Sequence, residues 1–221
     1  IGQIKNAIKY NEQVIELARE NKDKQHESAA LSNLGLAYAA MGDVRKAIVY
    51  YEQSLAIDRV IGARSGESSS LGNLGSAYYR LGDTLKAIEF YEQQLIIVRE
   101  IGNIRGEGNA LQGLGISHAD LGNTHKAIEF YEQALVIDRE IGYRQGEGAI
   151  LSNLGGQYAN LSEYEKASDY YNQALQNARE IGNKYGESKR LNGLAGVLIE
   201  KDDLQSAIKH SQESILIGHE I

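Results

Sequence analysis

The sequence has no cysteine, no proline and no tryptophan among its 221 residues. Without cysteine it can form neither a disulfide framework nor a thiolate metal site. Proline is the residue that most strongly interrupts a helix, and it is absent. A chain without proline and with periodic glycines favours short helices joined by tight glycine turns. No apolar run approaches the roughly 20 residues that cross a bilayer, and no signal-peptide pattern opens the chain. We therefore expect no membrane contact and a cytoplasmic location.

Positive charge is also scarce. The chain carries 23 Lys and Arg against 30 Asp and Glu, which gives a formal net charge of -7 at pH 7. Binding to a phosphate backbone needs Lys and Arg concentrated on one face. We therefore do not predict nucleic acid as a partner.

What the sequence does contain is a unit of 40 residues that repeats along its whole length. Leu-Gly pairs recur at Leu34-Gly35, Leu74-Gly75, Leu114-Gly115 and Leu154-Gly155, and Leu194-Ala195 continues the series. Alanine keeps the same step at Ala7, Ala47, Ala87, Ala127, Ala167 and Ala207. A fixed period of this length predicts a stacked repeat array in which each unit contacts mainly its neighbours.

The repeat fixes the predicted domain organisation as a single array over residues 1–221. Residues 1–22 are the second helix of a truncated repeat, and the full repeats are 23–62, 63–102, 103–142, 143–182 and 183–221. Because the chain opens inside a repeat and without Met, we expect a fragment of a longer protein. Apolar residues spaced three and four apart predict two helices in each repeat. The first helices lie near 25–41, 65–81, 105–121, 145–161 and 185–201, and the second near 44–61, 84–101, 124–141, 164–181 and 204–220.

The periodic glycines have two predicted roles. Gly42, Gly82 and Gly122 follow the first helices, where a left-handed residue ends a helix and glycine bears no steric penalty. Gly35 and its equivalents lie inside helices, where glycine costs about 1 kcal/mol relative to alanine. We interpret Gly35 and its equivalents as packing glycines at which two helix backbones cross closely. Ala195, in the fifth copy, fits such a size limit.

The pattern Leu-x2-Leu-Gly-x2-Tyr, with Ala nine residues later and an aromatic four after that, resembles the tetratricopeptide repeat. Its matching residues in one unit are Leu71, Leu74, Gly75, Tyr78, Ala87 and Tyr91. The unit is longer than the common one of about 34 residues. It is similar to the arrays of Pins/LGN cell-polarity adaptors, of kinesin light chains, and of bacterial proteins that fuse such arrays to caspase-like or nucleotide-binding domains. Residues 63–102 and 103–142 agree at 22 of 40 positions, and this likeness between units favours a bacterial array.

The resemblance implies an all-α fold, a right-handed α-α superhelix of antiparallel helix pairs whose first helices line the concave side. It also implies a scaffold that binds a peptide or partner protein in the concave groove. The alternative is a regulatory or sensor array that controls an adjacent caspase-like or NTPase domain.

Groove-facing positions that break the repeat are the candidate binding residues. Core positions stay constant because packing dictates them, while these vary in size and charge. They are Tyr79, Arg80, Arg105, Asn109, Gln112, Ile116, Asp120, Asn160, Lys189 and Asn192. The alternative interpretation is that these positions form an ordinary solvent-exposed surface whose residues have diverged between repeats without any role in binding.

No arrangement of residues predicts catalysis, a cofactor or a metal. Gly113-Leu-Gly115 begins like a dinucleotide fingerprint, but it lies inside a predicted helix and follows no strand. His118, Asp120 and His125 do not form an i, i+4 pair on one helix face. His118 takes the tyrosine position of its repeat, which indicates a core or half-buried histidine. We therefore predict a non-enzymatic protein.

Two further features concern the ends and the junctions of repeats. Arg59, Arg99, Arg139 and Arg179 stand eight residues before Glu67, Glu107, Glu147 and Glu187, a spacing that predicts ion pairs of at most about 1 kcal/mol if exposed. The leading half-repeat is expected to expose Ile4, Ile8, Val14 and Ile15. Because stable arrays have polar outer faces at their ends, this predicts end-to-end self-association.

Overall fold

A computed structural model describes residues 2–220, so Ile1 and Ile221, the ends of the predicted array, lie outside the described residues. The regular secondary structure in the described part is entirely α-helical. The helices are α1 (Gly2–Glu20), α2 (Lys24–Ala40), α3 (Val44–Ile61), α4 (Arg64–Arg80), α5 (Thr84–Glu100), α6 (Ile104–Asp120), α7 (Thr124–Glu140), α8 (Arg144–Asn160), α9 (Tyr164–Glu180), α10 (Lys184–Glu200) and α11 (Leu204–Glu220). Each predicted helix is present. The limits of the helices in the full repeats agree with the prediction within one residue, and the leading helix, predicted over 1–22, ends at Glu20.

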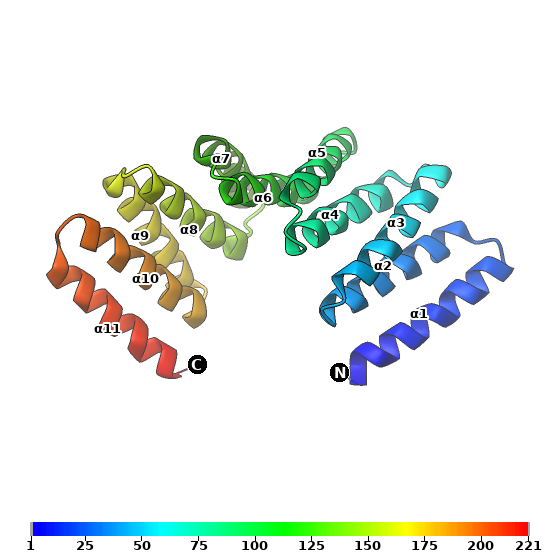
Figure 1. Cartoon of the computed structure of the whole chain (residues 1–221), viewed down its shortest axis with the longest axis horizontal. Helices are drawn as coiled ribbons and strands as arrows, with labels where there is room; N and C mark the ends of the chain where they lie inside the picture. The colour runs from blue at the N-terminus through cyan, green and yellow to red at the C-terminus, as the bar shows by residue number, and fades with distance from the viewer. Residues whose placement is uncertain (1, 221) are drawn as a thin grey trace. The chain divides into compact units, whose positions relative to one another are not determined.

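The chain divides into two compact units that meet in sequence at Leu121 and Gly122. The N-terminal unit holds α1–α6 and the C-terminal unit holds α7–α11 (Figure 1). Within each unit, consecutive helices pack against each other, and first helices of neighbouring repeats also touch: α2 with α4, α4 with α6, and α8 with α10. The boundary falls inside the repeat 103–142, and the single array over 1–221 stays a prediction.

The helices end as the turn glycines predict. Gly42, Gly82 and Gly122 have φ of 86°, 82° and 73°, in the left-handed region that glycine tolerates. Asp43 and Asp83 then cap the next helices, because each side chain accepts a hydrogen bond from the backbone N–H three residues later. These local choices explain why each helix stops after about four to five turns of 3.6 residues.

Three non-glycine residues occupy the same left-handed turn position: Lys22, Ser162 and Asp202, with φ of 58°, 60° and 61°. A side chain there is strained, so Ser162→Gly is expected to raise the free energy of unfolding by about 0.5 kcal/mol, the strain relieved less the added entropy of the unfolded chain. Chemical denaturation of the variant measures the gain. The matched reverse change, Gly82→Ser, should lower stability, and a loss of stability in Ser162→Gly would contradict the argument.

The helix-interior glycines pack differently from the prediction. At Gly75 a Cβ atom would lie 2.7 Å from the Tyr91 ring, and at Gly113 on α6 it would lie 2.6 Å from the same ring. The neighbour is therefore an aromatic side chain from the second helix, held between two glycines, and the predicted close crossing of backbones is wrong. Tyr171 repeats the arrangement between Gly155 and Gly193.

The fifth repeat shows why Ala195 is tolerated. Gly35, Gly75 and Gly155 each face the tyrosine 16 residues later, at 51, 91 and 171. The residue 16 positions after Ala195 is Ser211, which is much smaller. Alanine therefore occurs in the repeat that lacks the tyrosine ring.

The junction ion pairs are confirmed, and the carboxylates are more buried than the prediction supposed. Arg59 Nε donates to Glu67 Oε1 at 2.9 Å, and Arg64 Nη1 donates to Glu67 Oε2 at 2.6 Å. The Glu67 residue is only 7% exposed. The same pairing joins Arg19 to Glu27, Arg99 to Glu107, Arg139 to Glu147 and Arg179 to Glu187. Removal of the arginine partners of such a buried carboxylate is therefore expected to cost more than the loss of a surface ion pair, because it leaves a buried charge uncompensated.

The leading helix corrects one expectation. Ile15 on α1 is 7% exposed, because it packs with Ala30, Leu31 and Leu34 of α2, and Ile8 and Val14 pack at the edge of this cluster. The prediction that Ile15 is exposed is wrong, since the neighbouring α2 covers that face of α1. End-to-end self-association stays a prediction.

Candidate functional site: a polar pocket between α4, α5 and α6

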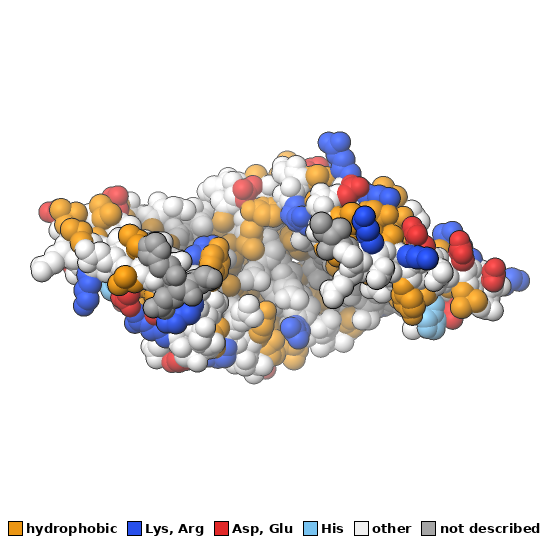
Figure 2. Space-filling view, turned by 90° about the horizontal axis from the view of Figure 1, so that it is seen from below, with side chains coloured by type: hydrophobic (Ala, Val, Ile, Leu, Met, Phe, Trp, Pro, Cys, Tyr) orange, Lys and Arg blue, Asp and Glu red, His pale blue; other side chains and the backbone are white. Residues whose placement is uncertain are grey.

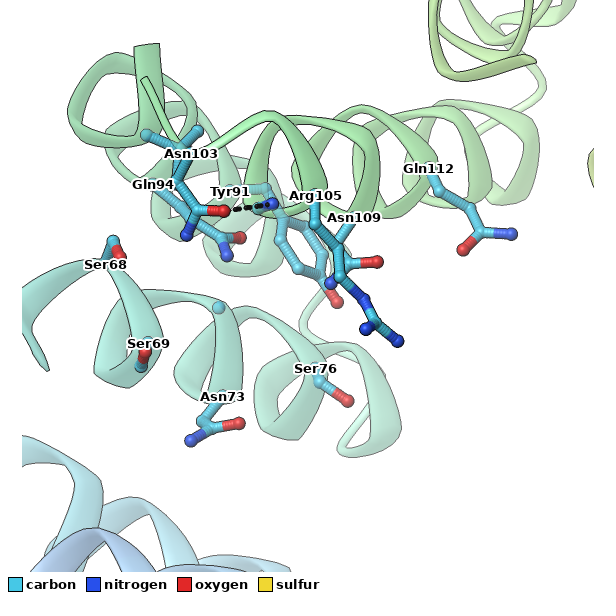
Figure 3. Close-up of a pocket in the computed structure, with 13 residues that line it drawn as sticks. Ser68, Ser69, Asn73, Ser76, Tyr91, Gln94, Asn103, Arg105, Asn109 and Gln112 are labelled. Atoms are coloured by element: carbon cyan, nitrogen blue, oxygen red, sulfur yellow. Dashed lines mark hydrogen bonds between the residues drawn. The ribbon is translucent and has the colours of Figure 1, made fainter. Parts of the chain in front are cut away.

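A pocket of about 450 Å³ opens between the first helices α4 and α6 of the N-terminal unit, with α5 behind it (Figure 3). Its lining is Ser68, Ser69, Gly72, Asn73 and Ser76 of α4, Tyr91, Gln94 and Val98 of α5, and Asn103, Arg105, Gly106, Asn109 and Gln112 at the start and along α6. Hydroxyl and amide groups dominate this lining. The site therefore offers many hydrogen-bond donors and acceptors and a single formal charge.

Three of the predicted binding residues meet in this pocket. Arg105, Asn109 and Gln112 extend from successive turns of α6 on the side that faces α4 (Figure 3). Their spacing of four and three residues places them on one face of the helix. The structure places these three residues along one wall of the pocket, and their role in binding stays a prediction.

The other predicted residues of the N-terminal unit lie outside the pocket. Arg80 is exposed at the end of α4, where its Nη1 donates to the backbone oxygen of Ala39 at 3.2 Å. Asp120, at the end of α6, accepts a hydrogen bond of 2.7 Å from Thr84 Oγ1. Tyr79 and Ile116 are half-buried.

The remaining candidates belong to the C-terminal unit. Asn160 ends α8, and Lys189 and Asn192 lie on α10, all three exposed. Lys189 Nζ lies 5.5 Å from the centroid of the Tyr185 ring, within reach of a cation–π contact. The pocket between α7, α8 and α9 of that unit is lined by none of these three residues.

Sequence reasoning missed the floor of the pocket, which α5 supplies. Gln94 is 8% exposed, and its Oε1 is buried without a hydrogen-bond partner among the described residues. Gly72 makes room for it, because a Cβ at that position would lie 2.5 Å from Gln94 Nε2. A buried carbonyl left without a donor costs about 1–3 kcal/mol. The available signal was that Ser54, Ala134, Ala174 and Ser214 occupy the same repeat position, so Gln94 is the amide that breaks the pattern.

Tyr91 forms the back of the pocket beside Gln94. Its ring is held between Gly75 and Gly113, and burial raises the pKa of its phenol above the ordinary value. A neutral phenol therefore lines the pocket at physiological pH.

A second pocket, of about 410 Å³, lies one repeat earlier, between α2, α3 and α4. Its wall includes Asp58, which is 4% exposed and accepts hydrogen bonds from Ser28 Oγ at 2.6 Å and Ser70 Oγ at 3.4 Å. Burial raises the pKa of Asp58, and the serine hydroxyls partly offset this. Ser69 lines both pockets, so they lie on the two sides of α4.

The surface chemistry around the groove is mixed in sign. In Figure 2, basic and acidic side chains are interspersed with apolar ones over the N-terminal unit, at the right of the view.

His118, at the tyrosine position of its repeat, is buried, as predicted. Among the side chains that the structure describes, which extend to residue 218, no three His, Asp or Glu are grouped as a metal site would require. None of the described helices is long and apolar enough to span a membrane.

The sequence comparison decides the family. The sequence model of the tetratricopeptide repeat matches residues 1–59, 66–140 and 147–216. The chain belongs to the tetratricopeptide-repeat family. The predicted all-α solenoid of helix pairs is thereby confirmed, and proteins of this family are interaction scaffolds that typically carry no catalytic site of their own.

Solved structures agree with this assignment. BtubC (BKLC) from P. vanneervenii matches with a TM-score of 0.86 and 22% identity over 98% of this chain and 91% of that one. The putative kinesin light chain of Podosopora anserina, with nearly identical repeats, has a TM-score of 0.73 and 18% identity over 86% and 93%. These two likenesses concern the fold alone. None of the curated proteins compared with the chain matches it in sequence.

A third similar structure belongs to a larger protein. It is a signal transduction ATPase with numerous domains from Pyrococcus horikoshii, which carries a tetratricopeptide-repeat sensor. The TM-score is 0.82 and the identity 25% over 95% of this chain, which spans about a third of that protein (33%). The chain therefore resembles two structures over most of their length and about a third of a multidomain ATPase.

Proposed function

We propose that this tetratricopeptide-repeat protein is a scaffold that binds an extended peptide, or a segment of a partner protein, along its first helices. The observation that carries this proposal is the polar pocket between α4 and α6, which gathers Arg105, Asn109 and Gln112 over a buried amide. An extended ligand can offer backbone N–H and C=O groups to such a wall while its side chains enter the pockets beside α4. A flat surface of Lys and Glu side chains without a pocket would not support this peptide-binding proposal.

Charge reversal in the groove tests the proposal. Dodecapeptides selected from a random phage-displayed library on the wild-type chain are expected to lose about tenfold or more in affinity for the double variant Arg80→Glu with Arg105→Glu. Fluorescence anisotropy with the labelled peptides measures the change. The matched control is Arg45→Glu with Lys126→Glu, which changes net charge equally at exposed positions of second helices. Peptides that bind both double variants equally would show that the groove is not the site.

A second candidate function rests on the likeness to the ATPase sensor. In this alternative the array controls a neighbouring catalytic domain of a longer protein, and ligand binding in the groove changes that domain's activity. The two functions differ in one measurable respect. Peptide binding should alter turnover by the full-length protein if the array is a sensor, and should leave turnover unchanged if it is a scaffold.

A further inference from the structure

The most informative group in the molecule is the Gln94 side chain, because it is buried, polar and incompletely bonded. It points from α5 into the space between α4 and α6 (Figure 3). Its Oε1 has no donor among the described residues, although the residue is more than nine-tenths buried. Buried polar groups of folded proteins are otherwise almost always paired. At the floor of the pocket, Gln94 Oε1 can therefore accept a hydrogen bond from a donor outside the chain.

The walls above Gln94 restrict what that donor can belong to. No Asp or Glu lines the pocket, and its one charged residue is Arg105. An ammonium or guanidinium group from a ligand would enter without an opposite charge and next to a like one. An aliphatic side chain would bury the amides and hydroxyls of the walls without partners, which is unfavourable.

Two polar ligand groups remain to be compared, a carboxylate and a carboxamide. A carboxylate carries acceptors only, so it could accept from the N–H groups of the walls but would leave the buried Gln94 Oε1 without a donor. A primary carboxamide carries two N–H donors and a carbonyl acceptor on one planar group. It is complementary to the Gln94 amide in either orientation of that amide, and its carbonyl can accept from Asn109 or Gln112 on the wall.

We propose that this pocket is the specificity subsite of the groove and that it seats the carboxamide side chain of an Asn or Gln in an extended peptide ligand. The proposal rests on the peptide-binding function proposed above and names the residue that the peptide must carry. Gln94 and the ligand carboxamide would form a reciprocal amide pair, with Gly72 leaving the room that Gln94 needs.

A double-mutant cycle between protein and peptide tests the pairing. The probes are dodecapeptides selected from a random phage-displayed library on the wild-type chain, with each Asn or Gln replaced in turn by Leu. At one position, this replacement is expected to weaken binding to the wild-type protein by about tenfold. Against Gln94→Ala the same replacement should change affinity by less than about twofold, because the partner amide is gone. Ala134 and Ala174 fill this repeat position elsewhere, so Gln94→Ala is expected to fold.

Controls separate this inference from the function on which it rests. Gln133→Ala removes an exposed glutamine from α7 and should leave the cycle unchanged. Selected peptides that lose affinity for the Arg80→Glu with Arg105→Glu variant, yet show no coupling to Gln94, would overturn the subsite and leave the groove intact. Selected peptides that share no Asn or Gln at one position would also overturn the subsite and leave the groove intact. A selection that enriches no peptide would overturn both.

Discussion

Replacing Gly75 with leucine is expected to destabilise the N-terminal unit by about 3 kcal/mol through overpacking. The Tyr91 ring lies against Gly75 on one side and Gly113 on the other, at 2.7 and 2.6 Å from ideal Cβ positions. Real Cβ contacts are longer than this, so a side chain must displace the ring. The ring lies between α4 and α6, so a leucine on α4 would push it toward Gly113 or into the pocket that it lines, in either case at the cost of its present packing.

Gly196→Leu is the matched control. Gly196 is also inside a first helix, but it is exposed and no heavy atom lies within 4 Å of its Cβ position. Leucine there should leave stability unchanged or raise it by up to about 1 kcal/mol, because leucine is the better helix former. Urea unfolding gives both values. Equal effects of the two substitutions would contradict the ring-packing account.

The chain suggests a rescue experiment. Its fifth repeat pairs Ala195 with Ser211 in place of glycine with tyrosine. Combining Gly75→Leu with Tyr91→Ser should therefore be less destabilising than the sum of the two single changes, since the removed ring leaves space for leucine. Such positive coupling is the signature of residues in direct contact. Strict additivity would place the strain elsewhere.

The fold was predictable to a large extent because local and global signals agree in a repeat protein. The same apolar spacing and nearly the same turn glycines occur in each unit, so the structure predicted for one repeat applies to the others. The interpretation of Gly35, Gly75 and Gly155 failed because periodicity shows that a position is small without showing what lies against it. The pairing with the tyrosine 16 residues later needs the arrangement of the two helices.

The site was predictable only on one wall. Arg105, Asn109 and Gln112 share a face of α6, which helical spacing places in the groove. Gln94 escaped notice because it belongs to a second helix, and only the three-dimensional packing shows that this helix forms the floor between two first helices. Gly72 escaped for the same reason. Its small size is meaningful only beside the glutamine that fills the space.

The buried carboxylates at the repeat junctions carry the second large effect. Glu67 holds Arg59 from the preceding helix and Arg64 from its own, and Arg64 also pairs with Glu100 on α5. Replacing both arginines with alanine leaves a buried charge without a partner. We expect this double change to cost about 3 kcal/mol at neutral pH. Glu67→Gln removes the charge along with its ion pairs and should cost less.

The exposed Glu92 on α5 provides a control for charge alone. Glu92→Gln alters the net charge as Glu67→Gln does, but the side chain is solvated and should have an effect within about 0.5 kcal/mol. Thermal and urea denaturation of the variants measures the differences. If loss of both arginines cost no more than loss of an exposed pair, the burial of Glu67 would not matter energetically.

The same pairs predict how stability depends on pH. Burial alone would raise the pKa of Glu67, but hydrogen bonds from Arg59 and Arg64 outweigh it, so the pKa lies below its ordinary value of 4.5. The pKa of Glu187 is lowered in the same way by Arg179 and Lys184, and Lys24 and Arg19 lower that of Glu27.

A carboxyl group whose pKa is lower in the folded state stabilises the fold above its unfolded value and loses that contribution as the pH falls through its folded value. Asp58 acts in the opposite sense, because burial raises its pKa and its ionised form opposes folding as the pH rises above 3.8. Asp23 and Asp203 also have a lowered pKa, so among the described residues five carboxyl groups with a lowered pKa stand against one with a raised pKa. We therefore predict a net loss of stability between about pH 5 and pH 2. In Glu67→Gln the loss should be shallower than in the wild type, and the two stability curves should converge in acid. Curves that stay parallel throughout would show that Glu67 does not titrate at a lowered pKa.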